Sequence, residues 1–141
     1  RYVDLFKNLS KLAQHHGLKI YIESLLDAHT LKYFLILLDK KNIGAVFDTG
    51  NRVLESDNLY DEIKALGDLI SHVHIKDKDR KGNNVILGTG LVNFKKVFDA
   101  LEEIEYKGEF NFETTRGVDP LNTAAYNLAL CNFFINEAAS Q

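Results

Sequence analysis

Short apolar runs alternate with helical segments along these 141 residues, and this alternation limits the folds open to the chain. Apolar runs of strand length cover residues 18–23, 43–48, 70–76 and 109–113. Apolar periodicity and helix-start residues predict helices at 2–15, 31–41, 59–67, 94–106 and 120–138. Strands that are separated by helices pair in parallel, through right-handed crossovers. The sequence therefore predicts an α/β fold of parallel β/α units, with strands apolar enough for a sheet covered on both faces.

Particular residues indicate where the helices begin and end. Thr30 and Asn93 are the expected N-caps of the helices at 31–41 and 94–106. Pro120 fits the first turn of the last helix, where its missing N–H costs nothing. Gly108 is expected to close the helical segment before the fourth strand.

The number of strands indicates part of a barrel. A complete barrel of eight β/α units needs about 250 residues, and this chain supplies roughly half of that. We expect residues 1–141 to form a single domain, half of a TIM-type barrel, with the amino-terminal half absent or supplied by another copy. The outer strands of such a half expose unpaired backbone groups, which favours a homo-oligomer or a missing amino-terminal half. The chain begins at Arg1 and contains no Met, which suggests a fragment of a longer protein.

Composition argues against several classes of partner. The net charge is −3, without a basic cluster that could follow a phosphate backbone, so nucleic acid is disfavoured. No apolar run approaches the ~20 residues that span a membrane, and no signal peptide is visible. Cys131 is the only cysteine, which fits a reducing compartment and predicts a cytoplasmic protein. We expect its thiol to be buried and inert.

An ionisable residue closes each of the four apolar runs. These residues are Glu23, Asp48, His74 and Glu113. Because the carboxyl ends of parallel strands converge on one rim, the four side chains are expected to meet there. A glutamate at a strand end is costly unless it is paired or binds a metal, so a salt bridge across the rim is the alternative. Equivalent positions on all four strands favour a divalent-metal site.

The donor set restricts the metal and suggests a chemistry. Carboxylate oxygens with one imidazole suit Mn²⁺, Mg²⁺, Co²⁺ or Zn²⁺, and the lack of thiolate ligands argues against structural zinc. Glu23 and Glu113 also offer two proton-transfer groups. If they lie on opposite faces of a sugar, one would remove a proton beside a carbonyl and the other would return it. A metal would stabilise the enediolate oxygens as a Lewis acid.

Neighbouring residues on the same rim allow more than one interpretation. His72 points to the same face as His74 and is expected one layer deeper, although such a pair can also hold one metal jointly. Arg80 would bind a substrate hydroxyl or phosphate, or be a solvated charge among Lys76 to Lys81. The stretch Gly88-Thr89-Gly90 would let the backbone approach a phosphate.

Five stretches of the sequence carry a family resemblance. They are Tyr21 to Ser24, Val46 to Asn51, His72 to Asp77, Leu87 to Gly90, and Tyr106 to Gly108 before Phe112-Glu113. With them the chain resembles the carboxyl-terminal half of the sugar-phosphate isomerase/epimerase family, whose fold is a xylose-isomerase-like TIM barrel. The most specific motif is His-x-His-x-Lys-Asp followed by Leu-Gly-x-Gly.

The resemblance implies roles for particular residues. Glu23, Asp48, His74 and Glu113 would be the metal ligands, and Glu23 and Glu113 the acid/base pair acting on a ketose or sugar phosphate. Arg80 falls where ketose 3-epimerases of this family place a substrate-contacting arginine. These epimerases carry a histidine three residues after the metal aspartate, where this chain has Asn51, which we expect to contact substrate.

Two other functions stay open. One is a metal-dependent hydrolase similar to the abasic-site endonucleases, which use a multi-zinc cluster and need more histidines on the rim. Here only His29, His72 and His74 are candidates. The other is a catalytically incomplete half-barrel, which would bind metal but leave the substrate unenclosed.

Overall fold

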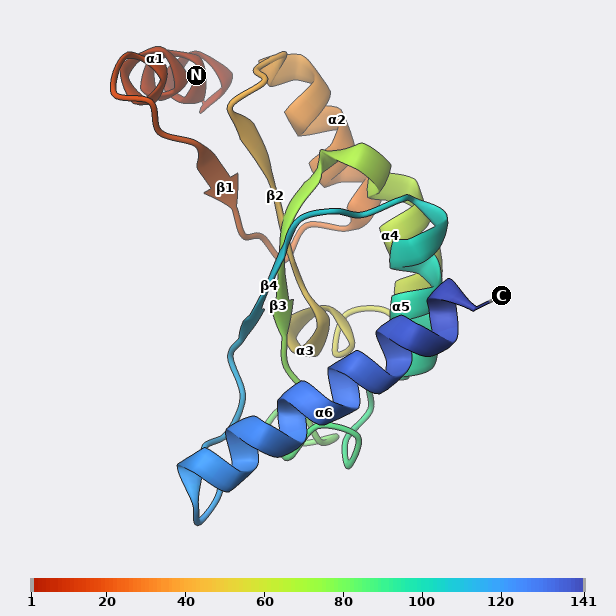
Figure 1. Ribbon diagram of the computed structural model, residues 1–141. Coiled ribbons are helices and arrows are strands. Elements are labelled where there is room, and N and C mark those ends of the chain that lie inside the picture. Colours follow the sequence, from red (N-terminus) through yellow and green to blue (C-terminus); the bar gives the residue numbers. More distant parts are fainter. Residues whose placement is uncertain (1, 141) are drawn as a thin grey trace.

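In the computed structural model, which describes residues 2–140, four strands form one parallel sheet in the order β1-β2-β3-β4. The strands are β1 (Ile20–Ile22), β2 (Ile43–Asp48), β3 (Ile70–Ile75) and β4 (Glu109–Phe112). The helices are α1 (Tyr2–His15), α2 (Ala28–Leu38), α3 (Thr49–Arg52), α4 (Leu59–Leu66), the 3₁₀ turn η1 (Gly67–Leu69), α5 (Phe94–Glu103) and α6 (Pro120–Ala139). Figure 1 shows this order, which confirms the predicted parallel α/β fold.

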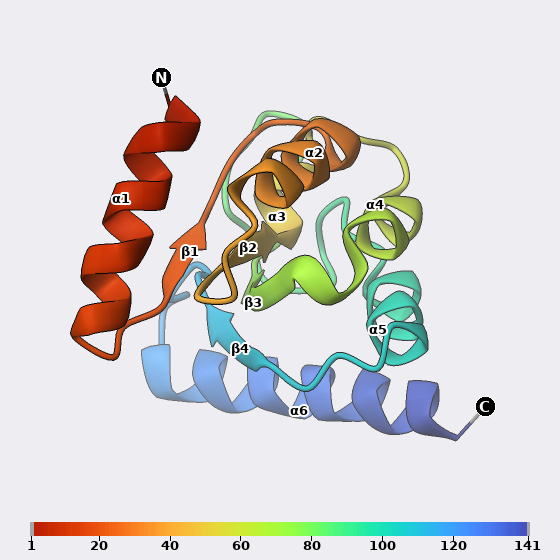
Figure 2. The ribbon, with the colours of Figure 1, turned by 90° about the horizontal axis from the view of Figure 1, so that it is seen from above.

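The longer helices α2, α4, α5 and α6 form an arc outside the strands when the molecule is seen from above, while α3 lies at the end of β2 (Figure 2). The expectation of strands buried on both faces holds for β2, whose six residues are all buried, but not for β1 or β4. Successive side chains of a strand point to opposite faces, so Phe47, Val73 and Ile75 pack under the helices and are almost fully buried. The alternate positions, among them Asp48 and His74, lie on the other face, which we call the inner face. All of β4 is exposed, since its outer edge has no partner among the described residues.

The hydrophobic core lies between the sheet and the helices. Its fully buried members include Leu38, Phe47, Ile63, Val73, Ile75, Leu87 and Val97. Cys131 on α6 is 5% exposed. Burial raises the pKa of its thiol to about 12, as expected for an inert cysteine.

An irregularity between β2 and β3 fixes which residues face each other. Ala45 pairs with Ile70, but Val46 pairs with His72, so Ser71 is an extra residue in β3. The shift brings Asp48 opposite His74, where unbroken pairing would have placed Val73. A local bulge therefore puts a carboxylate and an imidazole side by side on the inner face.

Some helix ends differ from the sequence predictions. The N-cap of α2 is Asp27, whose carboxylate accepts from the backbone N–H of Thr30 at 3.0 Å and from its hydroxyl at 2.6 Å. Thr30 therefore lies within the first turn and is not the cap. The helix at 94–106 is shorter than predicted, because it ends at Glu103 and Glu105 takes a left-handed conformation with φ 54°. Asn93 caps this helix as predicted.

The one-turn helix α3 was not predicted. It begins directly after β2, and the carboxylate of Asp48 caps it by accepting from the backbone N–H of Asn51 at 2.8 Å. The turn of the chain brings Asn51 back beside the strand end. Among residues 2–140, no helix combines the length and the apolar character needed to cross a bilayer.

Candidate metal centre

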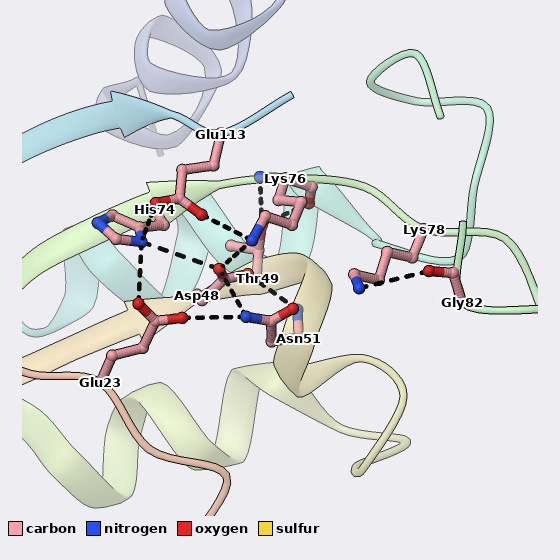
Figure 3. A network of polar contacts seen from close by, with 9 residues as sticks. All are labelled: Glu23, Asp48, Thr49, Asn51, His74, Lys76, Lys78, Gly82 and Glu113. Atoms are coloured by element: carbon pink, nitrogen blue, oxygen red, sulfur yellow. Dashed lines mark hydrogen bonds and ion pairs between the residues drawn. The ribbon is translucent and has the colours of Figure 1, made fainter. Parts of the chain in front are cut away.

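Three of the four strand-end residues, Glu23, Asp48 and Glu113, surround the imidazole of the fourth, His74 (Figure 3). Its Nδ1 lies 3.2 Å from Glu113 Oε1, 3.6 Å from Glu23 Oε2 and 3.8 Å from Asp48 Oδ2. These carboxylates come from β2 and from the residues that directly follow β1 and β4. Parallel pairing therefore brings together four side chains that are far apart in the sequence, as the strand-end pattern predicted.

The environment of His74 fits a divalent cation. Glu23, His74 and Glu113 each offer a ligand atom, and these three atoms lie within 4.8 Å of one another. His74 Nδ1 is buried and has no hydrogen-bond partner among the described residues, although three carboxylates surround it. A cation bound between these groups would satisfy the nitrogen and the oxygens together. Asp48 faces His74 but lies outside the group of three, so its place as a fourth ligand stays a prediction.

Lys76 is part of the same cluster, which the sequence reasoning missed. Its Nζ lies 2.7 Å from Asp48 Oδ2 and 2.7 Å from Glu113 Oε2, and the residue is only 8% exposed. The interpretation of this lysine as one of several solvated charges is therefore wrong. Lys76 lies two residues after His74, so the alternation that groups His72 with His74 would have placed it on the same face.

The ion pairs change the proton affinities of both partners. Burial lowers the pKa of Lys76, but its hydrogen bonds to Asp48 and Glu113 more than offset this, so the pKa is raised. The same ammonium lowers the pKa of Glu113, against a smaller opposing effect of burial and with help from His74. Glu113 is thus held in its charged form.

Asn51 contacts two of the carboxylates. Its side-chain amide donates to Glu23 Oε1 at 3.0 Å and to Asp48 Oδ2 at 2.9 Å. These bonds use both amide hydrogens, so the carbonyl oxygen is the group that Asn51 would offer a substrate. The predicted contact between Asn51 and substrate stays a prediction.

Arg80 lies apart from this cluster. It is exposed within the turn Asp79 to Asn83, where the Asp79 carboxylate accepts from the backbone N–H groups of Lys81 and Asn83. The predicted contact between Arg80 and substrate is not tested by this arrangement. His72 lies one layer below His74, as expected. Its ring stacks on Tyr21 at 5.7 Å and meets the His74 ring edge-on at 5.2 Å.

The loop after β3 is fixed by Asp77, which is 1% exposed. Its Oδ1 accepts from the backbone N–H groups of Lys78 and Val92 at 2.9 and 3.0 Å. Its Oδ2 accepts from those of Gly88 and Gly90 at 3.0 and 2.8 Å. The amides of Gly88 and Gly90 therefore bind a carboxylate of the chain itself, while that of Thr89 donates to the Ile86 carbonyl, and the expectation that this stretch would approach a phosphate is wrong.

Comparison with known proteins agrees with this geometry. The family model for the xylose isomerase-like TIM barrel matches residues 1–132. The chain belongs to that family. Three relatives are an L-ribulose 3-epimerase of Methylomonas sp. (strain DH-1), an inosose dehydratase of Bacillus cereus (strain AH820) and a ketose 3-epimerase of Arthrobacter globiformis. They are 34%, 28% and 32% identical to this chain over 89, 160 and 81 residues.

The coverage of these relatives is partial. The three alignments include 62%, 96% and 57% of this chain but 30%, 53% and 27% of the relatives. A solved structure of an L-ribulose 3-epimerase superposes with a TM-score of 0.85 at 21% identity, over 98% of this chain and 54% of that one. The chain therefore spans about half the length of that structure and shares its fold. It spans a smaller share of the two relatives that are 34% and 32% identical to it.

Proposed function

We propose that this chain carries the metal-binding half of a sugar isomerase or epimerase that acts on a ketose or a sugar phosphate. The observation that carries the proposal is the buried His74 Nδ1, which has no hydrogen-bond partner within residues 2–140 and faces one oxygen each of Glu23 and Glu113. Relatives named as L-ribulose 3-epimerase and ketose 3-epimerase support this reaction class.

The two glutamates would transfer the proton. They follow β1 and β4, the outer strands of the described sheet, so a sugar bound over the inner face would lie between them. One glutamate would take a proton from the carbon beside the carbonyl, and the other would return a proton to the opposite face. Asn51 and Arg80 would bind substrate hydroxyls or a phosphate.

Glu23, His74 and Glu113, with Asp48, would hold the ion, for which Mn²⁺, Mg²⁺, Co²⁺ and Zn²⁺ fit the donor set. When bound, such an ion would act as a Lewis acid on the substrate oxygens. Within residues 2–140 the group of possible ligands contains one histidine. This supports chemistry at a single ion and leaves the multi-zinc hydrolase as the weaker alternative.

We also propose that the chain is a single domain corresponding to the carboxyl-terminal half of the barrel. Within the described residues, β1 and β4 each pair on one side only, and each has a free edge that another strand would complete. Four further β/α units, from the same protein or from another copy, would enclose the substrate. An open half without them is the catalytically incomplete alternative.

Turnover of a panel of ketoses and their phosphates with Mn²⁺, in the complete encoded protein, tests the function. Exchange of solvent deuterium into the epimerised carbon should accompany turnover, because a proton leaves and returns. Both Glu23→Gln and Glu113→Gln should lower kcat by at least about a hundredfold, while Glu102→Gln, on the exposed side of α5, should not. Normal turnover in either glutamine variant at the site would refute the proton-transfer pair.

A further inference from the structure

Each glutamate of the centre has its two oxygens in different environments. Glu113 Oε1 faces His74 Nδ1 at 3.2 Å, while its Oε2 lies 2.7 Å from Lys76 Nζ. Glu23 Oε2 faces the same nitrogen at 3.6 Å, while its Oε1 accepts from Asn51 at 3.0 Å. In both residues a hydrogen-bond donor holds the oxygen that does not face His74, which we call the outer oxygen. The other oxygen then turns toward His74 (Figure 3).

The two donors differ in charge. Asn51 is a neutral amide, whereas Lys76 is an ammonium that bridges Asp48 on β2 and Glu113 after β4. Three carboxylates surround the site, with three negative charges when they are ionised. Lys76 compensates one of these charges, and a divalent ion would compensate the other two. With Lys76 and a divalent ion both present, the net charge of the site is therefore zero, although Lys76 also repels that ion.

The surroundings of Lys76 hold it in this place. The hydroxyl of Thr49 donates to the Lys76 carbonyl at 2.6 Å and accepts from its N–H at 2.9 Å. The lysine side chain then passes over Gly50, where a Cβ would lie 2.6 Å from Lys76 Cγ. The first turn of α3 thus fixes the backbone of the lysine and leaves space for its side chain.

We propose that Lys76 is a positioning residue of this centre, which orients Glu113 by its outer oxygen and, by its positive charge, weakens the binding of divalent ions. The inference rests on the proposed function and deepens it. Its effect on metal affinity differs from that of a lysine needed only for folding. Removing a purely structural residue would weaken metal binding or leave it unchanged, whereas removing a repelling charge should strengthen it.

Calorimetric titration with Mn²⁺ of the complete encoded protein tests the inference directly. Lys76→Met should bind Mn²⁺ about tenfold more tightly than the wild type, because a positive charge next to the ion is lost. Lys76→Arg keeps the charge and should bind within about threefold of the wild type. The matched control is Lys78→Met, because in Figure 3 a dashed line joins Lys78 Nζ to the Gly82 carbonyl, at 3.4 Å, and none joins it to a carboxylate of the cluster. The Mn²⁺ affinity of this variant should not change.

Turnover at saturating Mn²⁺ forms the second measurement. Lys76→Met should lower kcat by about tenfold to a hundredfold with a smaller change in KM, because Glu113 is no longer oriented. Lys76→Arg should recover part of kcat. Lys76→Gln offers a second neutral variant, with the same expectations if Lys76→Met does not fold.

The outcomes separate this inference from the proposed function. Unchanged or weaker Mn²⁺ binding in a folded neutral variant overturns the assignment of Lys76, whatever the activity. Failure of both neutral variants to fold also overturns it, since Lys76 would then be structural. If the wild type and its variants bind Mn²⁺ in the expected order of affinity but the wild type turns over no sugar, the proposed sugar chemistry fails and the assignment of Lys76 stands.

Discussion

Two buried aspartates near the carboxyl end of the sheet have opposite surroundings. Asp77 accepts four hydrogen bonds from backbone N–H groups, two on each oxygen. Asp48 is buried to nearly the same extent, but two of its contacts come from the side chains of Lys76 and Asn51. Its carboxylate also faces His74 Nδ1, which lacks a hydrogen-bond partner within residues 2–140.

The difference separates a structural carboxylate from one that can serve chemistry. Backbone amides cannot move away without unfolding the loop, so the Asp77 oxygens are not free for a ligand. Asp48 Oδ1 also accepts a backbone N–H, that of Asn51, but Asp48 Oδ2 is contacted by the side chains of Lys76 and Asn51, which can rearrange around an ion. Burial of an acidic group alone therefore says little about function, whereas the nature of its partners says much.

The largest effect should come from the ligand cluster. Replacing His74 by Ala removes the nitrogen around which the carboxylates gather, so Mn²⁺ affinity should fall by at least about a hundredfold. The unfolding midpoint in urea should change little, because His74 lies on the inner face, away from the apolar core. Mn²⁺ titration and urea unfolding check the two expectations. A variant that keeps its affinity would show that the cluster is not the metal site.

The opposite result is expected at Asp77. Asp77→Ala leaves buried amide groups without acceptors, so the free energy of unfolding should fall by about 3 kcal/mol or more. Urea unfolding measures this loss, with Asp57→Ala, at an exposed position, as the control. Mn²⁺ affinity per folded molecule should stay close to that of the wild type. A large loss of affinity with unchanged stability would break the contrast between the two aspartates.

Two glycines that enclose Asp77 should give smaller effects, for different reasons. A Cβ at Gly90 would lie 2.5 Å from the carbonyl oxygen of Lys78, so Gly90→Ala should cost about 2 kcal/mol of stability through overpacking. A Cβ at Gly88 would have its nearest neighbours at 3.7 Å, but φ is +83°, so Gly88→Ala should cost about 1 kcal/mol through backbone strain. Urea unfolding of both variants gives the order, and a larger loss in Gly88→Ala would contradict this account of the loop.

Much of the fold could be predicted because its signals are local. Strand-length apolar runs and the spacing of helices predict the parallel sheet. The ends of the predicted strands indicate the site residues Glu23, Asp48, His74 and Glu113. The cap of α2 was misplaced because Asp27 and Thr30 are both good caps three residues apart, and only the geometry shows that Asp27 binds Thr30. The helix α3 has a single turn and no apolar periodicity to reveal it.

The site was harder to predict where partners come from distant segments. Lys76 stands at the start of a run of charged residues, which resembles a solvated loop, and its ion pairs depend on how β2 and β4 flank β3. The partners of Asp77 are backbone amides up to 15 residues away, which no pattern of side chains displays. The insertion of Ser71, which sets Asp48 opposite His74, likewise appears only in the pairing of the strands.

Cys131 gives this chain a practical advantage for spectroscopy. Because the only thiol is buried and has a pKa of about 12, maleimide and methanethiosulfonate reagents should leave it unmodified at neutral pH. A cysteine introduced at exposed Arg80 would then carry a single spin label without prior removal of the native residue. Paramagnetic broadening of that label by added Mn²⁺ would report how close the turn that carries Arg80 comes to the ion.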